Sequence, residues 1–174
     1  LPGMYDGKDS ILYDGVESAV RMASNAGSAT VRGITTSIEQ EIGARLHFVA
    51  TLTYTKGQIT DKPTPMPLDH IPPLFGRISF RYDHKEFDAE ITYLHNGKKR
   101  LTDYSPSGED NLQYALPIGM PSWSTLNIRT SWMASERCRI QVGVDNLLDI
   151  NYRTFSSGIH SPGRNFIFSV RVGI

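Results

Sequence analysis

The chain ends in Asn165-Phe-Ile-Phe-Ser-Val-Arg-Val-Gly-Ile174, a run in which one side of the alternation is entirely apolar. Successive side chains of a β-strand point to opposite faces, so this run predicts a strand with one apolar and one largely polar face. The apolar face would carry Phe166, Phe168, Val170, Val172 and Ile174. The same alternation from Cys138 to Val144 predicts a second strand. The polar segment between them, 146–164, is typical of a surface loop.

Six segments further upstream alternate in the same way. The weakest is 16–22, and the others are 30–42, 44–55, 77–83, 87–93 and 126–134. With the two C-terminal strands they predict about eight strands. Residues 1–15 are rich in Gly and Asp and predict a loop, and Asn25-Ala-Gly-Ser28 predicts a turn. Because the apolar phase changes at Gly33, we expect a β-bulge there.

Short and long connections alternate along the chain. The breaks at Gly43, 83–86 and 134–137 are short, whereas those at 57–73, 96–121 and 146–164 are long. The first long segment contains five prolines, which cannot donate to a sheet, so it is not a central strand. An antiparallel up-and-down sheet would place all short turns at one end and all long loops at the other. Transmembrane β-barrels have this arrangement, with short periplasmic turns and long extracellular loops.

Aromatic residues of the apolar faces gather near the ends of the predicted strands. We expect them to form a lipid-facing belt, because aromatic rings favour the headgroup level of a bilayer. The predicted belt residues are Tyr54, Tyr82, Phe87, Tyr93, Trp123, Trp132 and Phe166. The opposite faces carry charges of both signs, which suit a water-filled lumen. A soluble sandwich with its polar faces outward would explain the alternation equally well.

Composition excludes several classes of function. The 174 residues have zero formal net charge and a pI near 7.1, which argues against a nucleic-acid binder. A single cysteine, Cys138, excludes a disulfide within the chain. No apolar run is long enough for a transmembrane helix, but a mean hydropathy of −0.30 is compatible with a membrane barrel. We find no catalytic site, no metal-ligand spacing among the histidines and no cofactor motif. The Lys98-Lys-Arg100 run is typical of a solvated surface, and near an outer membrane surface it could touch lipopolysaccharide phosphates or an anionic substrate.

Several motifs occur in an order that resembles the C-terminal part of bacterial TonB-dependent outer-membrane receptors. They are Pro67-Leu-Asp-His-Ile-Pro-Pro73, Gly119-Met-Pro-Ser-Trp123, Asn146-Leu-Leu-Asp149, Tyr152-Arg153 and Pro162-Gly-Arg-Asn-Phe166, followed by the terminal strand. Two positions depart from the family pattern. The chain ends on Ile174 rather than on an aromatic residue, and Gly33-Ile34-Thr35 lacks the family's acidic residue.

The resemblance implies a transmembrane barrel of about 22 strands with a plugged lumen. Residues 1–174 would then be the C-terminal part of the barrel domain, and the plug domain and the N-terminal barrel strands would lie outside this sequence. The chain begins at Leu1 without a signal peptide, so either the signal was removed or the sequence is a piece of a longer protein, and the resemblance favours the piece. The implied partners are the rest of the same receptor, the TonB complex through the missing N-terminal region, the outer-membrane lipid and lipopolysaccharide, and a small-molecule substrate.

The function implied by the resemblance is high-affinity uptake of a scarce nutrient of the ferric siderophore, haem or cobalamin type across the bacterial outer membrane. Loop residues would bind the substrate, and the candidates are Arg100, Tyr104, Tyr114, Arg153 and His160. Two alternatives remain open: a small passive outer-membrane barrel and a soluble β-sandwich binding domain. The sandwich would place Phe80, Tyr82, Trp132, Phe166 and Phe168 in a closed core rather than in one exposed band.

Overall fold

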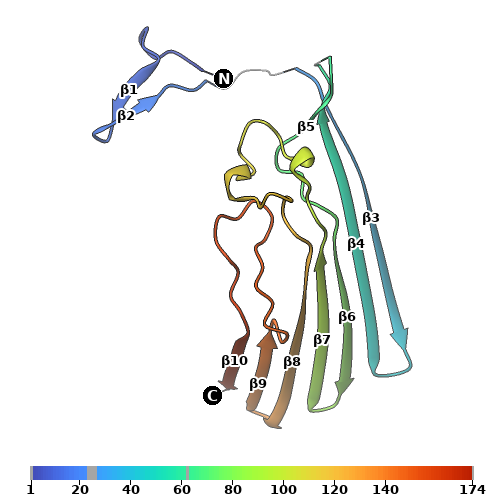
Figure 1. Ribbon diagram of the computed structural model, residues 1–174. Coiled ribbons are helices and arrows are strands. Elements are labelled where there is room, and N and C mark those ends of the chain that lie inside the picture. The colour runs from blue at the N-terminus through green and yellow to red at the C-terminus, as the bar shows by residue number, and fades with distance from the viewer. Residues whose placement is uncertain (1, 23–26, 62, 174) are drawn as a thin grey trace.

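The computed structural model describes residues 2–22, 27–61 and 63–173, and most of its strands form one antiparallel sheet of eight strands (Figure 1). The strands of this sheet are β3 (Ala29–Ile42), β4 (Leu46–Ile59), β5 (Met66–Pro67), β6 (Phe75–His84), β7 (Phe87–Asn96), β8 (Trp123–Ser135), β9 (Cys138–Asp145) and β10 (Asn165–Val172). Seven of them follow one another in chain order from β3 to β10, and β5 pairs with β4. The long loop between β7 and β8 contains two 3-10 helices, η1 (Leu101–Asp103) and η2 (Leu112–Tyr114).

The strands predicted downstream of residue 29 are confirmed, and several are longer than predicted. β4 continues to Ile59, β7 continues to Asn96, and β8 already begins at Trp123. The loop predicted at 57–73 is accordingly 60–74, and the loop predicted at 96–121 is 97–122. The reason is that backbone pairing continues past the last alternating apolar residue wherever a neighbouring strand supplies a partner, as Val31 does for Gly57.

The prediction of a loop at residues 1–15 is wrong. β1 (Ser10–Tyr13) and β2 (Val16–Ala19) form a separate two-stranded hairpin, so the weak strand predicted at 16–22 does not join the large sheet. The eighth strand of that sheet is β5 instead. Asp14 and Gly15 both have positive φ, at 49° and 78°, and an Asp-Gly pair with this geometry makes the tight hairpin turn.

The β-bulge predicted at Gly33 is also wrong. All fourteen residues of β3 pair with β4 without a shift in register, and Gly33 lies opposite Thr55. A Cβ atom at Gly33 would lie 2.8 Å from the Tyr54 carbonyl oxygen, so the glycine permits close approach of the two strands. A register shift occurs instead in β8, between Met133 and Ser135. Asn25 and Ala26 of the predicted turn, and the terminal Ile174, lie outside the described residues.

The two faces of the sheet differ in the way that the sequence predicts. The apolar face contains a row of directly opposed side chains across six strands: Phe48, Phe80, Ile91, Ile128, Val144 and Phe166. This face is exposed, with Phe80 44% and Phe166 74% accessible. The polar face carries the sheltered side chains, among them Thr92 at 9% and Thr125 at 2%. A sheet of a water-soluble protein would have the reverse distribution.

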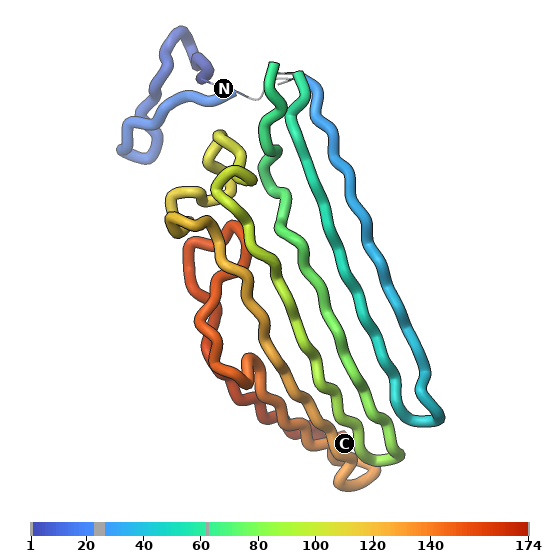
Figure 2. The backbone as a smooth tube through the Cα atoms, turned by 45° about the vertical axis from the view of Figure 1, so that its right-hand side comes forward, coloured from blue at the N-terminus to red at the C-terminus, as the bar shows by residue number. Residues whose placement is uncertain are grey.

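The sheet is curved, as Figure 2 shows, and its two edges are apart. Within the described residues no second sheet packs on the apolar face, so the aromatic side chains of the row do not lie in a closed core. The sandwich alternative is therefore wrong for this part of the chain, and the fold is an arc of an antiparallel up-and-down barrel. In the described ranges, no helix has the length and apolar composition needed to cross a membrane.

Candidate functional site

The three long loops, 60–74, 97–122 and 146–164, gather at one end of the sheet, which we call the long-loop end (Figure 1). The tight turns after β3, β6 and β8 lie at the other end, the short-turn end. The prediction that connections alternate between the two ends is confirmed. A long loop at the end of a rigid sheet is a common place for a binding site, because the sheet positions the loop while its side chains remain free to vary.

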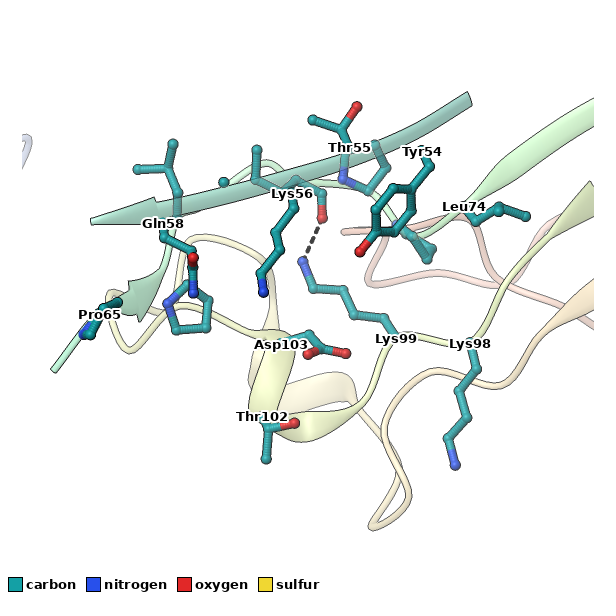
Figure 3. Close-up of a pocket in the computed structure, with 16 residues that line it drawn as sticks. Tyr54, Thr55, Lys56, Gln58, Pro65, Leu74, Lys98, Lys99, Thr102 and Asp103 are labelled. Atoms are coloured by element: carbon teal, nitrogen blue, oxygen red, sulfur yellow. Dashed lines mark hydrogen bonds between the residues drawn. The ribbon is translucent and has the colours of Figure 1, made fainter. Parts of the chain in front are cut away.

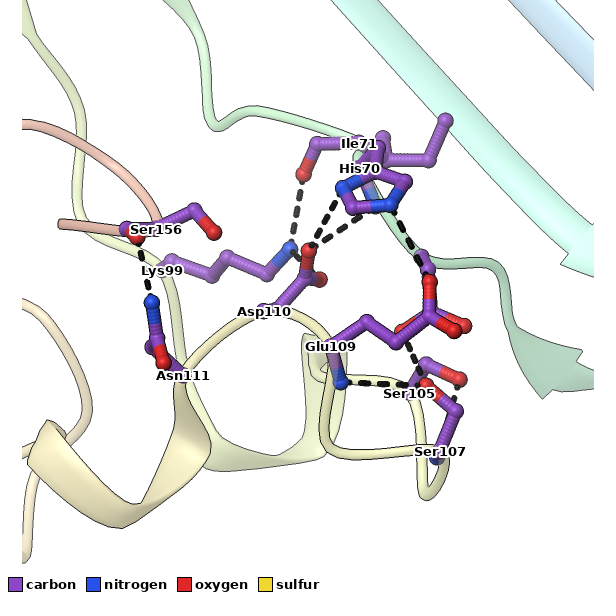
Figure 4. A network of polar contacts seen from close by, with 10 residues as sticks. His70, Ile71, Lys99, Ser105, Ser107, Glu109, Asp110, Asn111 and Ser156 are labelled. Carbon is purple, nitrogen blue, oxygen red and sulfur yellow. Dashed lines mark hydrogen bonds and ion pairs between the residues drawn. The ribbon is translucent and has the colours of Figure 1, made fainter. Parts of the chain in front are cut away.

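A buried ion pair connects the long loops. The ammonium group of Lys99 donates hydrogen bonds to the Ile71 carbonyl oxygen at 2.7 Å and to the Asp110 carboxylate at 3.1 Å (Figure 4). The side chains of Lys99 and Asp110 are 2% and 0% exposed. Lys99 also lies 4.1 Å from the centre of the Phe155 ring, a favourable cation–π distance. One cation thus makes contact with residues of all three loops.

The surroundings of Asp110 complete this network. Its carboxylate accepts a hydrogen bond from the His70 backbone N–H at 2.8 Å, and the His70 ring lies 3.2 Å from the Glu109 carboxylate (Figure 4). Asn111 donates to the Ser156 carbonyl oxygen at 2.7 Å, which adds a second link to the last loop. Because a buried charge is costly unless it is paired and hydrogen-bonded, these contacts make the loop arrangement specific.

Lys99 therefore corrects one prediction. In the Lys98-Lys-Arg100 run, Lys98 and Arg100 are exposed as expected for a solvated surface, but Lys99 is buried. The backbone of Lys99 pairs with that of Met120 in an isolated bridge, and the Lys99 side chain is 2% exposed. Residues some distance away in the sequence supply its partners, so no local signal could have identified it.

The structure brings together three of the five predicted substrate-binding residues. Tyr104, Tyr114 and Arg153 line one small cavity of about 20 Å³, and the Arg153 guanidinium donates to the Tyr114 carbonyl oxygen. Tyr114 is half exposed, whereas Tyr104 is only 8% exposed. Burial raises the pKa of Tyr104 above its ordinary value, Asp110 raises it further, and Arg153 lowers it. Tyr104 therefore stays protonated and contributes chiefly to loop packing.

Arg100 and His160 do not line this cavity. Arg100 precedes η1, and its backbone N–H donates to the Asp103 carboxylate at 3.2 Å. His160 pairs through a ring nitrogen with the Asn151 side chain in the last loop. Both residues are exposed, so both remain available to a ligand. Substrate binding by any of the five residues stays a prediction.

A larger cavity, of about 390 Å³, lies between the end of β4 and the proline-rich loop (Figure 3). Pro72 and Pro73 form part of its wall, and Lys56, Lys98 and Asp103 give it charged groups. The sequence analysis did not find this cavity, because its walls come from segments whose packing depends on where the loop folds back. Gly57 allows that packing, since a Cβ atom there would meet the Ile71 side chain at 2.6 Å.

The charged side chains of the polar face are largely paired with one another. The Arg129 guanidinium donates to both oxygens of Asp145 at 2.8 Å, and Arg139 lies 3.4 Å from Asp88. Further pairs join Arg77 to Glu90 and Arg81 to Asp83. Exposed pairs of this kind each contribute little stability. Their mixed signs make the inner wall polar without giving it one strong net charge.

Six of the seven predicted belt residues lie on the apolar face and are exposed: Tyr54, Tyr82, Phe87, Tyr93, Trp132 and Phe166. The structure places Trp123 elsewhere. Trp123 pairs with Asn96 and shares its face with the buried Thr125, and its ring lies 4.2 Å from that of Tyr152. β8 begins with Trp123 in the inward phase, and Tyr152 of the last loop covers its ring. Lipid contact by the other six stays a prediction.

Within residues 2–22, 27–61 and 63–173, no group of three or more His, Cys, Asp or Glu side chains is placed to hold a metal ion. The long-loop end offers groups for hydrogen bonding, ring contacts and charge interactions.

Comparison with known proteins agrees with this geometry. The family described as "TonB dependent receptor-like, beta-barrel" matches residues 5–147. A comparison with curated proteins finds no match.

The solved structures that are similar to the chain include the following three. The copper transporter OprC has 18% sequence identity and a TM-score of 0.67, with 83% of this chain covered. A mutant of the ferric enterobactin receptor PfeA from Pseudomonas aeruginosa has 17% identity and a TM-score of 0.59 over 83%. The ferric-catecholate import receptor Fiu from E. coli, in its closed form, has 14% identity and a TM-score of 0.61 over 91%.

The chain spans 22% to 23% of the length of these three proteins. The curved sheet described above, with open edges at β3 and β10, therefore corresponds to part of a larger barrel. At these identities the structural similarity establishes the fold. Together with the family match over most of its residues, it shows that the chain belongs to the TonB-dependent receptors and forms an arc of their β-barrel.

Proposed function

We propose that this chain is the C-terminal part of an outer-membrane transporter that takes up a scarce nutrient with energy supplied through TonB. The observation that carries the proposal is an arc of a TonB-dependent receptor barrel whose apolar face is exposed and whose polar face carries the most buried side chains of the sheet. A lipid-facing outer wall and a watery or plugged lumen require this distribution. The plug domain, the remaining barrel strands and the TonB-contacting segment would be supplied by the rest of the same receptor.

The substrate class proposed is a metal chelate of the ferric siderophore type, with haem and cobalamin as other members of the same nutrient class. The names of two of the three similar structures refer to ferric or ferric-catecholate import, which supports this choice. The name of the third refers to copper, so a copper-containing substrate is the second candidate. Tyr114, Arg153, Arg100 and His160 at the long-loop end offer aromatic and cationic groups suited to an anionic chelate.

Uptake by the full-length receptor tests this proposal. Cells that carry the receptor as their only transporter of this family would be given ferric siderophores, haem, cobalamin or copper, and accumulation would be measured with and without a protonophore. We expect accumulation of one substrate class, abolished when the inner-membrane proton gradient collapses. Accumulation that continues without the gradient would instead identify a passive barrel, the alternative left open by the sequence.

A pair of loop variants tests the site. Tyr114→Ala removes a half-exposed ring from the small cavity, and Tyr13→Ala removes an exposed ring from the separate hairpin. We expect the first variant to weaken substrate binding by the full receptor roughly tenfold, and the second to leave it unchanged. Equal effects of the two changes would contradict the assignment of the site to the long loops.

A further inference from the structure

The free edge of β10 carries an unbalanced charge on the polar face of the sheet. β10 pairs with β9 on one side, and among the described residues no strand pairs with its other side (Figure 1). Near the short-turn end, Arg171 of β10 lies directly opposite Arg139 of β9. Like charges in this position repel, so this cross-strand pair is unfavourable without nearby carboxylates.

Only one of the two arginines has a carboxylate partner in the described part of the chain. The Arg139 guanidinium lies 3.4 Å from the Asp88 carboxylate and donates to the Ser131 hydroxyl at 3.0 Å. Arg171 is exposed and forms no ion pair with any described carboxylate. The charge of Arg139 is therefore balanced from the β7 side, whereas the charge of Arg171 is not balanced.

A cavity of about 440 Å³ lies beside these residues at the short-turn end. Arg137, Arg139 and Arg171 line it, and among the described residues of the lining Glu136 carries the one carboxylate. Glu136 is exposed in the turn between β8 and β9. The lining therefore has an excess of positive charge, and it includes the end of the strand whose other edge is free.

The backbone fixes the position of Arg171. Val172 pairs with Cys138, and the N–H of Gly173 donates to the Arg137 carbonyl oxygen at 2.8 Å. In the isolated arc, water on the open side of β10 screens the Arg171 guanidinium. In a closed barrel the next strand replaces part of that water, and a cation that loses water without gaining a partner is costly.

The position of Arg171 identifies the source of the missing anion. On the open side of β10, the nearest polar-face position is the residue directly opposite on the next strand, with its Cβ roughly 4.5–5.5 Å away. A lipid phosphate lies on the wrong side, because Arg171 belongs to the polar face of the sheet and lipid contacts the apolar face. A carboxylate on the next strand is therefore the partner that fits.

We propose that the barrel strand that pairs with the free edge of β10 carries an Asp or Glu on its polar face, opposite or diagonal to Arg171. This ion pair sets the register of that pairing. A slip of one residue would turn the carboxylate to the lipid-facing side, and a slip of two would move it by about 7 Å. The inference rests on the proposed function, because it requires a closed barrel with strands outside residues 1–174.

Zero-length cross-linking of the full-length receptor in outer membranes tests this pairing. Arg171→Lys introduces a primary amine, and a carbodiimide joins an amine only to a carboxylate in direct contact with it. Mass spectrometry of the peptides then locates each link. Arg139→Lys is the positive control, because its amine should join Asp88. Lys85 is the matched control, since it is an exposed lysine of the short-turn end in the middle of the arc, between β6 and β7.

We expect the amine at position 171 to join an Asp or Glu of a barrel strand outside residues 1–174, and Lys85 to form no such link. Charge reversal gives a second measurement. Arg171→Glu should lower the fraction of heat-modifiable folded band at least twofold, because two carboxylates would then face each other. Lys85→Glu should leave that fraction unchanged. Replacement of the identified carboxylate by Arg should restore the band of the Arg171→Glu receptor.

A link from position 171 to the plug domain, or to a carboxylate within residues 1–174, would overturn the inference. The same holds if position 171 forms no link while Arg139→Lys joins Asp88, or if the exchanged charges do not restore the band. Equal losses in Arg171→Glu and Lys85→Glu would also contradict it. Any of these results in a receptor that inserts and transports its substrate would leave the proposed function intact. A receptor that never forms a closed barrel would overturn both.

Discussion

Lys99 and Asp110 show how much one residue pair determines at the long-loop end. A lysine ammonium buried to 2% exposure is stable only because the Asp110 carboxylate and the Ile71 carbonyl oxygen receive its hydrogen bonds. The desolvation of two charges offsets much of their attraction, so the pair contributes more to the specific arrangement of the loops than to net stability.

Removing either partner alone should disorder the loops. Asp110→Ala leaves an unpaired buried cation, which costs about 3–5 kcal/mol, and Lys99→Met leaves an unpaired carboxylate at a similar cost. The double change Lys99→Met with Asp110→Leu should cost clearly less than either single change. Hydrogen exchange of the amides at 99–120 in the full receptor measures the effect. Lys98→Met, on the exposed neighbour, is the control and should leave exchange unchanged.

Gly119 is required by both its backbone angle and its surroundings. Its φ of +86° disfavours other residues, and a Cβ atom would collide with the Lys99 carbonyl oxygen. We expect Gly119→Ala to open the Lys99–Met120 bridge at a cost of about 1–3 kcal/mol, seen as faster exchange of those two amides. Gly108→Ala is the control, because Gly108 has a similar φ of +83° but no atoms near the position of an added Cβ. It therefore tests backbone strain without collision, and it should lower stability less than Gly119→Ala. Equal effects would mean that the collision is relieved at little cost.

The two tryptophans of the chain should respond differently to lipid. Trp132 is 52% exposed on the apolar face, whereas Trp123 packs on Tyr152. In vesicles of brominated lipid, which quench only rings in contact with acyl chains, Trp132→Phe should reduce the quenchable fluorescence of the full receptor. Trp123→Phe should leave the quenchable part unchanged. A loss of quenching in Trp123→Phe would contradict the inward position of its ring.

At the scale of elements, the strands of the large sheet and the β1–β2 hairpin play different parts. β10 pairs along its whole length with β9, from Asn165 to Val172, and presents its other edge for further pairing. The hairpin has its own ladder and forms none with the large sheet in the described residues. A membrane barrel tolerates no unpaired strand edge in lipid, whereas an appended hairpin outside the lipid is optional.

Deletions in the full receptor test this difference. Removal of 165–174 should abolish assembly, because β9 would be left with an unpaired edge that the barrel could not close. Replacement of 4–20 by a short Gly-Ser linker should leave the folded, heat-modifiable band on a denaturing gel intact. Retention of that band after the first deletion, or its loss after the second, would contradict the assignment of the two elements.

At the scale of the whole molecule, the arc is incomplete as a membrane structure. Its strands run in order from β3 to β10, and these two edge strands do not pair with each other. Closure of this sheet requires other strands, which matches a chain that covers less than a quarter of the similar structures. The exposed apolar face gives the isolated arc no favourable environment in water.

Expression of residues 1–174 alone should therefore yield aggregated protein with no heat-modifiable band in vesicles, while the full receptor gives a compact, detergent-resistant band. The physical reason is that two long unpaired edges each leave a row of backbone groups unsatisfied in lipid. Gel mobility before and after heating measures the difference. If the 174 residues insert and close by themselves, the chain is a small independent barrel and the proposed receptor function fails.

The sequence alone determined the features that depend on local periodicity. Period-two alternation located β3, β4 and β6 to β10, and connection length predicted the two ends of the sheet, whereas β5 lies in the segment predicted as a loop. The aromatic pattern placed six belt residues on the correct face. These signals are readable because a strand fixes the direction of each side chain relative to its neighbours in the chain. The Asp14-Gly15 pair is an equally local signal for a tight turn, and the prediction of a loop at residues 1–15 did not use it.

Only the tertiary structure decided which distant residues meet. Four features depend on partners from other strands or loops. They are the burial of Lys99, the inward position of Trp123, the continuous β3–β4 register at Gly33, and a groove on the apolar face over Ala50 and Gly76. The neighbouring sequence does not indicate such partners. Loop residues lack the fixed periodicity of strands, and their environment is determined by the chain segments that fold against them. The sequence thus determined the wall of the barrel, and the tertiary structure determined the sites at its rim.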